Sequence, residues 1–523
     1  MHSSAQSSPS ATDQIALLVQ LNGQLRIENE SLKGQLDWLK RQLFGPKSER
    51  RLVDTDSLQL GLVDLSGEGN NPPAPITQDI AAHRRRQPAQ PTTGDDESTR
   101  FFDDQRVPVE VIAVANPEIV GLAPEAYEIV SEKVSFRLAQ RPGSYVVLKY
   151  VRPVVKLKAT QVLSCPPAPQ GVIEGSRADV SFLAGMVVDK FAYHLPLYRQ
   201  HQRLTDSGIS VSRGWLTQLT HSALSLLTPI HDAQLASIRA SRVKSMDETP
   251  IKVGPAGNGK MKGGYFWPVY GEQDEVSFLY FPSRSHKHVE QALGLSPPEG
   301  AVLLSDGYDA YRRYAEKVGL THAQCWSHSR RKFFEAQKFE PERAAQALDQ
   351  IGALYAIEAK IREAGLTGPP KRAYRMQHTR PLVEAFFAWV EDQFVHQGLL
   401  PSNPLTEALA YVRERRAALS VFLDDAEVQI DTNHLERALR AIPMGRKAWL
   451  FCSTEVGAHH VGVANSLIVT CRLHGIDPYD YLVDVLQRVG QHPASQVELL
   501  TPRLWKQHFA ENPLRSDVHK PAA

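Results

Sequence analysis

Apolar residues recur with a seven-residue period near the start of the chain, between Ile15 and Leu43. Leucine occupies one seam position of this repeat throughout, at Leu18, Leu25, Leu32 and Leu39. A leucine repeat sustained over about four heptads predicts a coiled coil, which we place at residues 12–50 with these leucines as its dimerisation contacts. The alternative is an amphipathic helix that packs against its own domain.

The pattern disappears between residues 66 and 100, where Pro, Gly, Asn, Gln and Thr dominate and aromatic residues are scarce. Such a composition cannot bury enough apolar surface to order itself, so we expect a flexible linker. Arg84, Arg85 and Arg86 form a basic run inside it. Runs of charge are usually solvated, but this one is a candidate contact for DNA.

Alternating apolar and polar positions follow in residues 101–175, most clearly at 107–114, 127–138 and 145–157. This period of two predicts a small domain of short strands.

The period then changes to a helical one over residues 178–235. Two helical stretches, 197–204 and 210–219, flank Gly208 in the manner of a helix-turn-helix. In that motif the second helix lies in the major groove, which makes Ser212, Arg213 and Gln218 candidate contacts to base edges. A plain helical hairpin is the alternative, because glycine is common between any two helices.

A different arrangement follows: strands are predicted at 242–253, 264–271 and 276–282, a helix at 286–293 and a fully apolar strand at 301–304. Three antiparallel strands, a crossover helix and a buried parallel strand are typical of an α/β fold of the ribonuclease H-like kind. We place this core at residues 240–340 and 425–470.

Two aspartates fall at related places in these strands, Asp247 in the first and Asp306 at the carboxyl end of the fourth. Neighbouring strands are about 4.8 Å apart, so the two carboxylates could share Mg²⁺, which prefers oxygen ligands. A pair of such ions stabilises the attacking and leaving oxygens of a phosphoryl displacement. Taken singly, each aspartate is also explained as an ordinary strand end or an Asp-Gly turn.

A third carboxylate is available at Glu436, 130 positions after Asp306 (436 − 306). Residues 341–424 lie between them and show charged helical patterns, which predicts a helical insertion, and residues 471–515 predict a C-terminal helical element. Glu436 lies beside the apolar stripe of a short helix and could reach a sheet edge. The alternative is a surface pair with Arg440 four positions on.

Composition and net charge exclude some classes of protein. A chain of 523 residues with a net charge of +1 is long enough for several domains, but it lacks the basic excess of a protein that coats DNA indiscriminately. Basic residues instead gather locally, as at Arg330, Arg331 and Lys332. There is no apolar run long enough for a membrane span and no signal peptide, so we expect a cytoplasmic protein without membrane partners.

Ordered motifs along nearly the whole chain resemble the large transposases of the bacterial IS66 insertion-sequence family. They are Gln42-Leu43-Phe44-Gly45 with Lys47-Ser48-Glu49, Asp247-Glu248-Thr249-Pro250, Ser305-Asp306-Gly307-Tyr308 with Tyr311, Cys325-Trp326-Ser327-His328 with Arg330 to Phe333, Asn433 to Arg437, Asn465-Ser466-Leu467, and Gly475-Ile476-Asp477-Pro478.

This resemblance implies a DDE transposase whose triad is Asp247, Asp306 and Glu436. With Mg²⁺ or Mn²⁺, such an enzyme hydrolyses a phosphodiester at the terminal inverted repeats of its element, and the freed 3′-hydroxyl attacks target DNA. The resemblance also implies a homo-oligomer on the nucleoid and two small companion proteins encoded by the same element. Residues expected to contact DNA near the site are His328, Arg330, Arg331, Lys332, Arg437 and Arg440.

The chain departs from the family in its cysteines. Relatives usually carry a cysteine-paired zinc segment after the linker, whereas this region holds only Cys165, so we expect the small domain to be a degenerate zinc-binding region without zinc. Cys325 and His328 are expected to pack together rather than bind a metal. Two other functions stay open: a DNA-binding relative that has lost catalysis, and a ribonuclease H-like nuclease that cleaves without joining.

Overall fold

The structure is a computed structural model that describes residues 101–105, 107–141, 143–257, 260–396 and 400–519. By its contacts the chain divides into two units, Met1–Thr93 and Gly94–Ala523, and every element below belongs to the second. The predicted coiled coil, the leucines at 18, 25, 32 and 39, most of the linker and the basic run Arg84–Arg86 lie outside the described residues. Among the described helices, none combines the length and the apolar content needed to cross a membrane.

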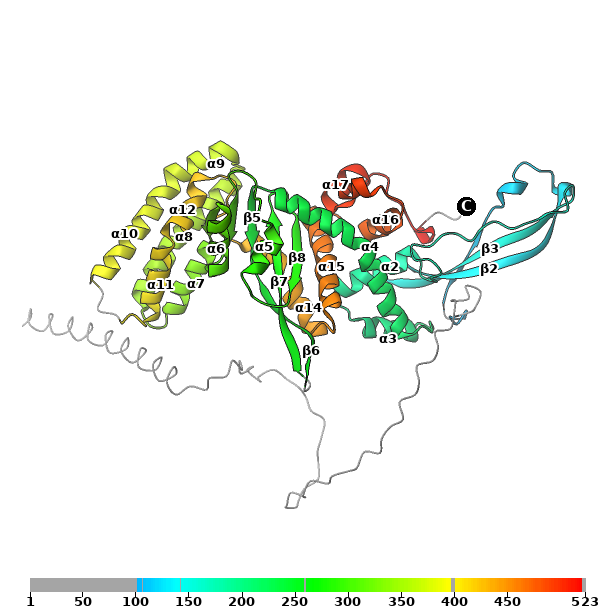
Figure 1. Cartoon of the computed structure of the whole chain (residues 1–523), viewed down its shortest axis with the longest axis horizontal. Coiled ribbons are helices and arrows are strands. Elements are labelled where there is room, and N and C mark those ends of the chain that lie inside the picture. The colour runs from blue at the N-terminus through cyan, green and yellow to red at the C-terminus, as the bar shows by residue number, and fades with distance from the viewer. Residues whose placement is uncertain (1–100, 106, 142, 258–259, 397–399, 520–523) are drawn as a thin grey trace, which may run out of the picture. The chain divides into compact units, whose positions relative to one another are not determined.

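The predicted small β region contains one sheet with strand order β1-β3-β2. Its strands are β1 (Val109–Ala113), β2 (Tyr127–Arg141), β3 (Ser144–Leu157) and a short β4 (Leu163–Ser164). β2 and β3 are antiparallel and end in a tight hairpin, where Arg141 pairs with Ser144 and Gly143 has φ +87°. They form the long ribbon labelled in Figure 1. One end of this ribbon packs on α2 (Val180–Phe191), whose first turn is capped by Asp179.

The predicted helix pair is present as α3 (Leu197–Asp206) and α4 (Arg213–Ala240), with Gly208 at φ +87° between them. The second helix is longer than its pattern indicated. It continues through Pro229, and Gln234 in its last third donates hydrogen bonds to the carbonyl of Val276 at 2.8 Å and the hydroxyl of Thr470 at 3.1 Å. α4 therefore connects the helix pair to the second sheet.

The second sheet has the strand order β10-β9-β5-β7-β6, with β8 also paired to β7. Its strands are β5 (Val243–Met246), β6 (Thr249–Gly257), β7 (Lys260–Gly271), β8 (Val276–Phe281), β9 (Val302–Ser305) and β10 (Thr321–Gln324). β5, β7 and β8 pair antiparallel, and α5 (Lys287–Leu293) leads to β9, which lies parallel to β5. All four residues of β5 and of β9 are buried, as expected of central strands.

Both faces of this sheet are covered. Met246, Trp267 and Leu303 pack with residues of α5 and of α6 (Asp309–Val318) in one apolar cluster. On the other face Phe266, Val276 and Phe278 pack against α15 (Glu455–Leu473). Figure 1 shows α15 beside β8. The second sheet is thus the middle layer of an α/β arrangement.

Most of the described residues between β10 and α15 are helical, including most of 341–424, for which helices were predicted. α7 (Trp326–Ala336) packs on α8 (Pro341–Glu363) and α11 (Pro404–Glu414). The other helices of this part are α9 (Gly368–Tyr374), a π-helical turn (Arg375–Thr379), α10 (Arg380–His396), α12 (Arg416–Asp424), α13 (Asn433–Leu439) and α14 (Ala441–Trp449). After α15 the chain ends in α16 (Pro478–Arg488) and α17 (Pro502–His508), with short 3-10 turns.

Candidate active site

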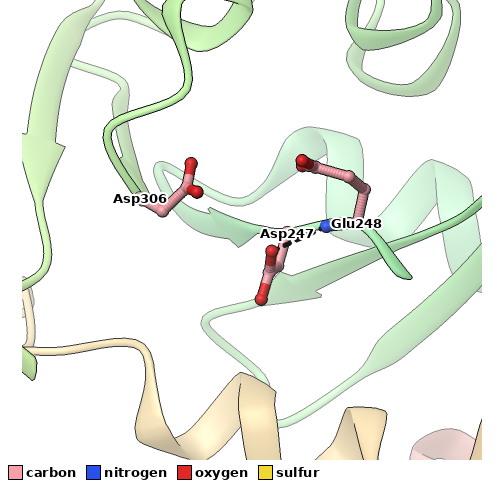
Figure 2. A group of neighbouring side chains, drawn as sticks. All are labelled: Asp247, Glu248 and Asp306. Carbon is pink, nitrogen blue, oxygen red and sulfur yellow. Dashed lines mark hydrogen bonds between the residues drawn. The ribbon is translucent and has the colours of Figure 1, made fainter. Parts of the chain in front are cut away.

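Three carboxylates meet where β5 and β9 end. Asp247 and Glu248 lie between β5 and β6, where the pairing of these strands with β7 is interrupted, and Asp306 directly follows β9. Because β5 and β9 are parallel, with Ser245 opposite Leu304, their carboxyl ends lie side by side. One oxygen from each of the three side chains lies within 4.8 Å of the others. Figure 2 shows the three side chains and the elements that carry them. Among the described residues this is the group whose ligand atoms are close enough to hold a metal ion.

The two aspartates are oriented by backbone amides. The amide of Glu248 donates to Oδ1 of Asp247 at 2.7 Å, and the amide of Tyr308 donates to Oδ1 of Asp306 at 2.9 Å. Burial, followed by the charges of Glu248 and Asp306, raises the pKa of Asp247 to about 7. A carboxyl that resists ionisation because it faces other carboxylates gains most from a nearby cation.

Glu248 is already paired within the protein. Its side chain is only 3% exposed, Nε of Arg284 donates to its Oε1 at 2.6 Å, and the Tyr311 hydroxyl donates to its Oε2. Burial raises its pKa, and the hydrogen bond from Tyr311 opposes that shift. Since both oxygens are engaged, Glu248 is better suited to position Arg284 and Tyr311 than to ligate an ion.

Sequence reasoning did not single out Glu248. Strict alternation along a strand sends adjacent side chains to opposite faces. Here the ladder between β5 and β7 stops at Met246 and resumes at Thr249, so the intervening residues escape that rule. The available signal was the position of Glu248 directly after Asp247 in a motif shared with the IS66 transposases.

Glu436 lies in the first turn of α13, and the acidic group described above contains Glu248 in its place. The Thr432 hydroxyl donates to Oε1 of Glu436 at 3.4 Å. Thr432 is itself 3.3 Å from the Cys325 sulfur, which directly follows β10. Glu436 is therefore held at the edge of the sheet where β9 and β10 also end, because the amide of Cys325 donates to the carbonyl of Ser305.

The same helix is anchored to β5. Nε2 of His434 lies 3.0 Å from the hydroxyl of Ser245, two residues before Asp247, and the His434 ring packs edge-on against Tyr270. Burial lowers the pKa of His434, which keeps it neutral near pH 7. Cys325, predicted to pack rather than bind a metal, is buried and accepts hydrogen bonds from the amide and hydroxyl of Thr432.

Basic side chains surround Asp306 in a hollow of about 320 Å³. Its lining includes Arg284, His328, Arg331 and Lys332. The electrostatic influence of His328 opposes the rise in the pKa of Asp247. Among the described residues the buried Nδ1 of His328 has no hydrogen-bond partner. Three of the predicted DNA contacts therefore lie around one of the predicted carboxylates, and Arg284 joins them although the sequence did not single it out.

The other residues predicted to contact DNA do not line this hollow. Arg330 and Arg440 are exposed, and Arg437 lines a separate hollow of about 560 Å³ that also contains Glu272, Asp274 and Asp431. Ser212, Arg213 and Gln218 are exposed on the first turns of α4, where the Ser212 hydroxyl accepts the amide of Trp215 at 3.1 Å.

These features define a mixed α/β protein with an acidic candidate metal site beside a basic hollow. Comparison with known proteins is more specific. Residues 175–460, more than half of the chain, match the model of the IS66 family of transposases, residues 466–502 match the IS66 C-terminal element, and residues 31–96 match the model described as transposase C of IS166 homeodomain. The chain belongs to the IS66 transposase family.

Similar proteins occur in Sinorhizobium fredii (strain NBRC 101917 / NGR234). The uncharacterized protein y4hP is 28% identical over 511 residues, which cover 92% of this chain and 89% of that protein. The uncharacterized protein y4jD is 29% identical over 500 residues, which cover 91% of this chain and 94% of that protein. The similarity therefore extends over nearly the full length of both relatives.

Proposed function

We propose that this chain is a DNA transposase that binds the terminal inverted repeats of its element and catalyses metal-dependent strand cleavage and strand transfer. One observation carries the proposal: in a chain of the IS66 transposase family, Asp247 and Asp306 converge at the ends of adjacent parallel strands beside a basic hollow.

The sheet supports a ribonuclease H-like catalytic core. β5 and β6 pair with β7 in one continuous register: Met246 lies opposite Val269, and Thr249, three residues later, lies opposite Phe266, three residues earlier on β7. The two strands are therefore equivalent to one strand with an interruption. Three antiparallel strands, then β9 and β10 parallel to β5, make a five-strand order of 3-2-1-4-5 counted along the chain. In a ribonuclease H-like fold with this strand order, two catalytic carboxylates lie on strands 1 and 4. Asp247 and Asp306 lie at the ends of the corresponding strands, β5 and β9.

The residues present fit Mg²⁺ or Mn²⁺. Hard cations prefer carboxylate oxygens. In Asp247 and in Asp306 a backbone amide donates to Oδ1 and fixes the orientation of the carboxylate, which leaves the second oxygen available to an ion. We propose Glu436 as the third ligand, because both oxygens of Glu248 are engaged. When bound, the metal supplies an activated water and neutralises charge on the phosphate.

The protein's own side chains then position the phosphodiester. Arg284 is held by Glu248 and lies over the Tyr308 ring, 4.1 Å from its centroid, while the Tyr308 hydroxyl donates to the Arg284 carbonyl at 2.6 Å. This double support orients the guanidinium at the hollow without consuming all five of its donors. Arg284, Arg331 and Lys332 would bind the phosphate oxygens, and His328 would contact the same group.

Recognition of the DNA ends is assigned to two regions. The exposed first turns of α4, with Ser212, Arg213 and Gln218, would enter the major groove, and the run Arg84–Arg86 would contact the backbone. In addition, we propose a homo-oligomer through residues 12–50.

The test is cleavage and joining of labelled DNA carrying the element's own ends, with Mg²⁺. Asp306→Asn and Glu436→Gln should each lose cleavage while still binding the ends. Asp309→Asn is the matched control, since Asp309 lies three residues from Asp306 but pairs with Arg312 and Arg313 on the surface. Full activity of Glu436→Gln would remove it from the triad, cleavage without joining would favour a nuclease, and end binding without cleavage by the wild type would favour an inactive relative.

A further inference from the structure

The turn after α14 is strained and exposes two large apolar side chains. Leu450 has φ 63° and ψ −50°, and the amide of Phe451 donates to the carbonyl of Trp449 at 2.7 Å. This is the rare form of the three-residue γ-turn, which costs free energy for any residue with a side chain. Leu450 is nonetheless 65% exposed and Phe451 44% exposed, so their burial does not repay that strain.

The turn is held firmly on both sides. Before it, the amide of Leu450 donates to the carbonyl of Arg446 in the last turn of α14. After it, Cys452 is buried and pairs with β6: its amide donates to the carbonyl of Lys252, and its carbonyl accepts the amide of Gly254, both at 2.9 Å. The apolar turn, Leu450 with Phe451, is therefore presented on a rigid support.

Exposed lysines lie on both elements that hold this turn, and Glu455 is exposed after it. Lys447 is exposed on α14, three positions before Leu450. Lys252, Lys260 and Lys262 are exposed on the β6–β7 hairpin, and Lys262 pairs with Val253, which in turn forms a bridge with Cys452. Figure 1 shows β6 running beside α14. Phe451 also lines a hollow of about 530 Å³ together with Trp449 and Val456. A partner that offered only an apolar face would cost the neighbouring lysines their water without giving them partners, so a partner that also carries negative charge fits better.

Duplex DNA fits this combination. Lysines neutralise phosphates, while exposed apolar side chains inserted between base steps unstack and bend the duplex. We propose that Leu450 and Phe451 insert into duplex DNA while Lys252, Lys262 and Lys447 contact its backbone, which forms a DNA-bending contact distinct from the acidic site. This inference rests on the proposed action on DNA and adds a second, sequence-independent contact to it.

Binding can be measured without catalysis. The full chain carrying Asp306→Asn is titrated, without divalent cation, against a duplex of arbitrary sequence containing one 2-aminopurine, whose fluorescence rises when its stack opens. We expect this chain to raise the fluorescence. The further pair Leu450→Gly and Phe451→Ala should abolish the rise and weaken binding about tenfold, as for the loss of an inserted wedge.

Folding is controlled within the same experiment. Glycine tolerates the positive φ at position 450, so Leu450→Gly should leave the apparent Tm unchanged or higher. Leu122→Ala, at an exposed apolar residue of the loop between β1 and β2, should change neither binding nor fluorescence. Lys262→Ala should reduce the slope of log affinity against log salt by about 1, whereas Lys360→Ala on α8 should not.

The outcomes separate the two proposals. Binding and fluorescence that are unaffected by Leu450→Gly with Phe451→Ala would overturn the insertion while leaving the transposase function untouched. Failure of the chain with the intact turn to bind any duplex, including one with the element's own ends, would overturn both.

Discussion

At the scale of the residue, the site depends on how each carboxylate is engaged. Asp247 faces other carboxylates and has one backbone donor, whereas Glu248 has a charged and a neutral donor on separate oxygens. The same chemical group therefore has two roles one residue apart. Sequence could predict that Asp306 lies at a strand end, but it placed Asp247 inside a strand, whereas Asp247 follows the end of β5. It could not predict the role of Glu248, because Arg284 and Tyr311 lie 36 and 63 positions away.

Asp247→Asn should stabilise the protein at pH 8 in the absence of divalent cations. Burial raises the pKa of Asp247 to about 7, so the folded state holds this proton more tightly than the unfolded chain does. Wild-type stability then falls as the pH rises from about 4 to about 7, by about 1–3 kcal/mol. Calorimetry at pH 5 and pH 8 should show the higher Tm of the variant mainly at pH 8.

The control for this prediction is Asp309→Asn. Hydrogen bonds from Arg312 and Arg313 lower the pKa of Asp309, so its charge stabilises the fold above the ordinary aspartate range and the variant should gain nothing at pH 8. Mg²⁺ should raise the Tm of the wild type more than that of Asp247→Asn. An equal gain for Asp247→Asn at pH 5 and pH 8 would contradict the pKa argument.

Glu248→Gln should reduce cleavage even though Glu248 is not assigned to the metal. The neutral amide cannot hold the Arg284 guanidinium as the carboxylate does, and the Arg284 side chain, which is 46% exposed, can then turn to water. Because burial raises the pKa of Glu248, folding does not favour its charged form, so the variant should keep at least the Tm of the wild type near pH 7. Glu290→Gln, which breaks an exposed pair with Lys317, should leave cleavage unchanged. Cleavage assays and thermal denaturation of both variants test this, and full cleavage by Glu248→Gln would show that Glu248 does not position Arg284.

At the scale of the element, periodicity predicted most of what surrounds the site. The strands at 264–271 and 276–282, the helix at 286–293 and the strand at 301–304 are present within a few residues, whereas the strand expected at 242–253 is divided into β5 and β6. The main error in extent is α4, which continues to Ala240 across Pro229. Proline removes one backbone donor and normally ends a helix, but here buried residues on both sides of it, Leu227 and Ile230, keep the helix packed.

The packing of α15 on β8 gives an element-scale prediction. A Cβ built at Gly462 would lie 2.3 Å from the carbonyl oxygen of Phe278, a backbone atom that cannot move aside cheaply. Gly462→Ala should therefore destabilise the fold by about 2 kcal/mol or more. Gly352→Ala, in α8, meets nothing within 4 Å and should instead stabilise it by about 0.5–1 kcal/mol. Opposite shifts in Tm would confirm the close approach, and equal shifts would contradict it.

At the scale of the whole molecule, segments that pattern alone assigns to separate regions share one apolar cluster. Leu138 of the first sheet, Leu224 of α4, Phe278 of the second sheet and Leu482 of α16 all belong to it. Periodicity shows which face of an element is apolar but not which distant element covers that face, so the sequence could not reveal this shared core. The residues from Gly94 to Ala523 accordingly form one compact unit, which is separate from residues 1–93.

This division yields the last prediction, which concerns the leucine repeat in the first unit. Deleting Ile15–Leu43 removes the seam leucines but none of the residues of the second unit. The truncated chain should keep the Tm of the intact protein, because the apolar cluster is unchanged, and should sediment with a lower mass because the coiled-coil contacts are lost. Deleting residues 65–93, a segment of equal length without the repeat, should leave the number of chains per sedimenting particle unchanged. If that number also stays unchanged after removal of the leucines, the chain self-associates through its second unit, and the contacts would then have to lie on the exposed surfaces of that unit.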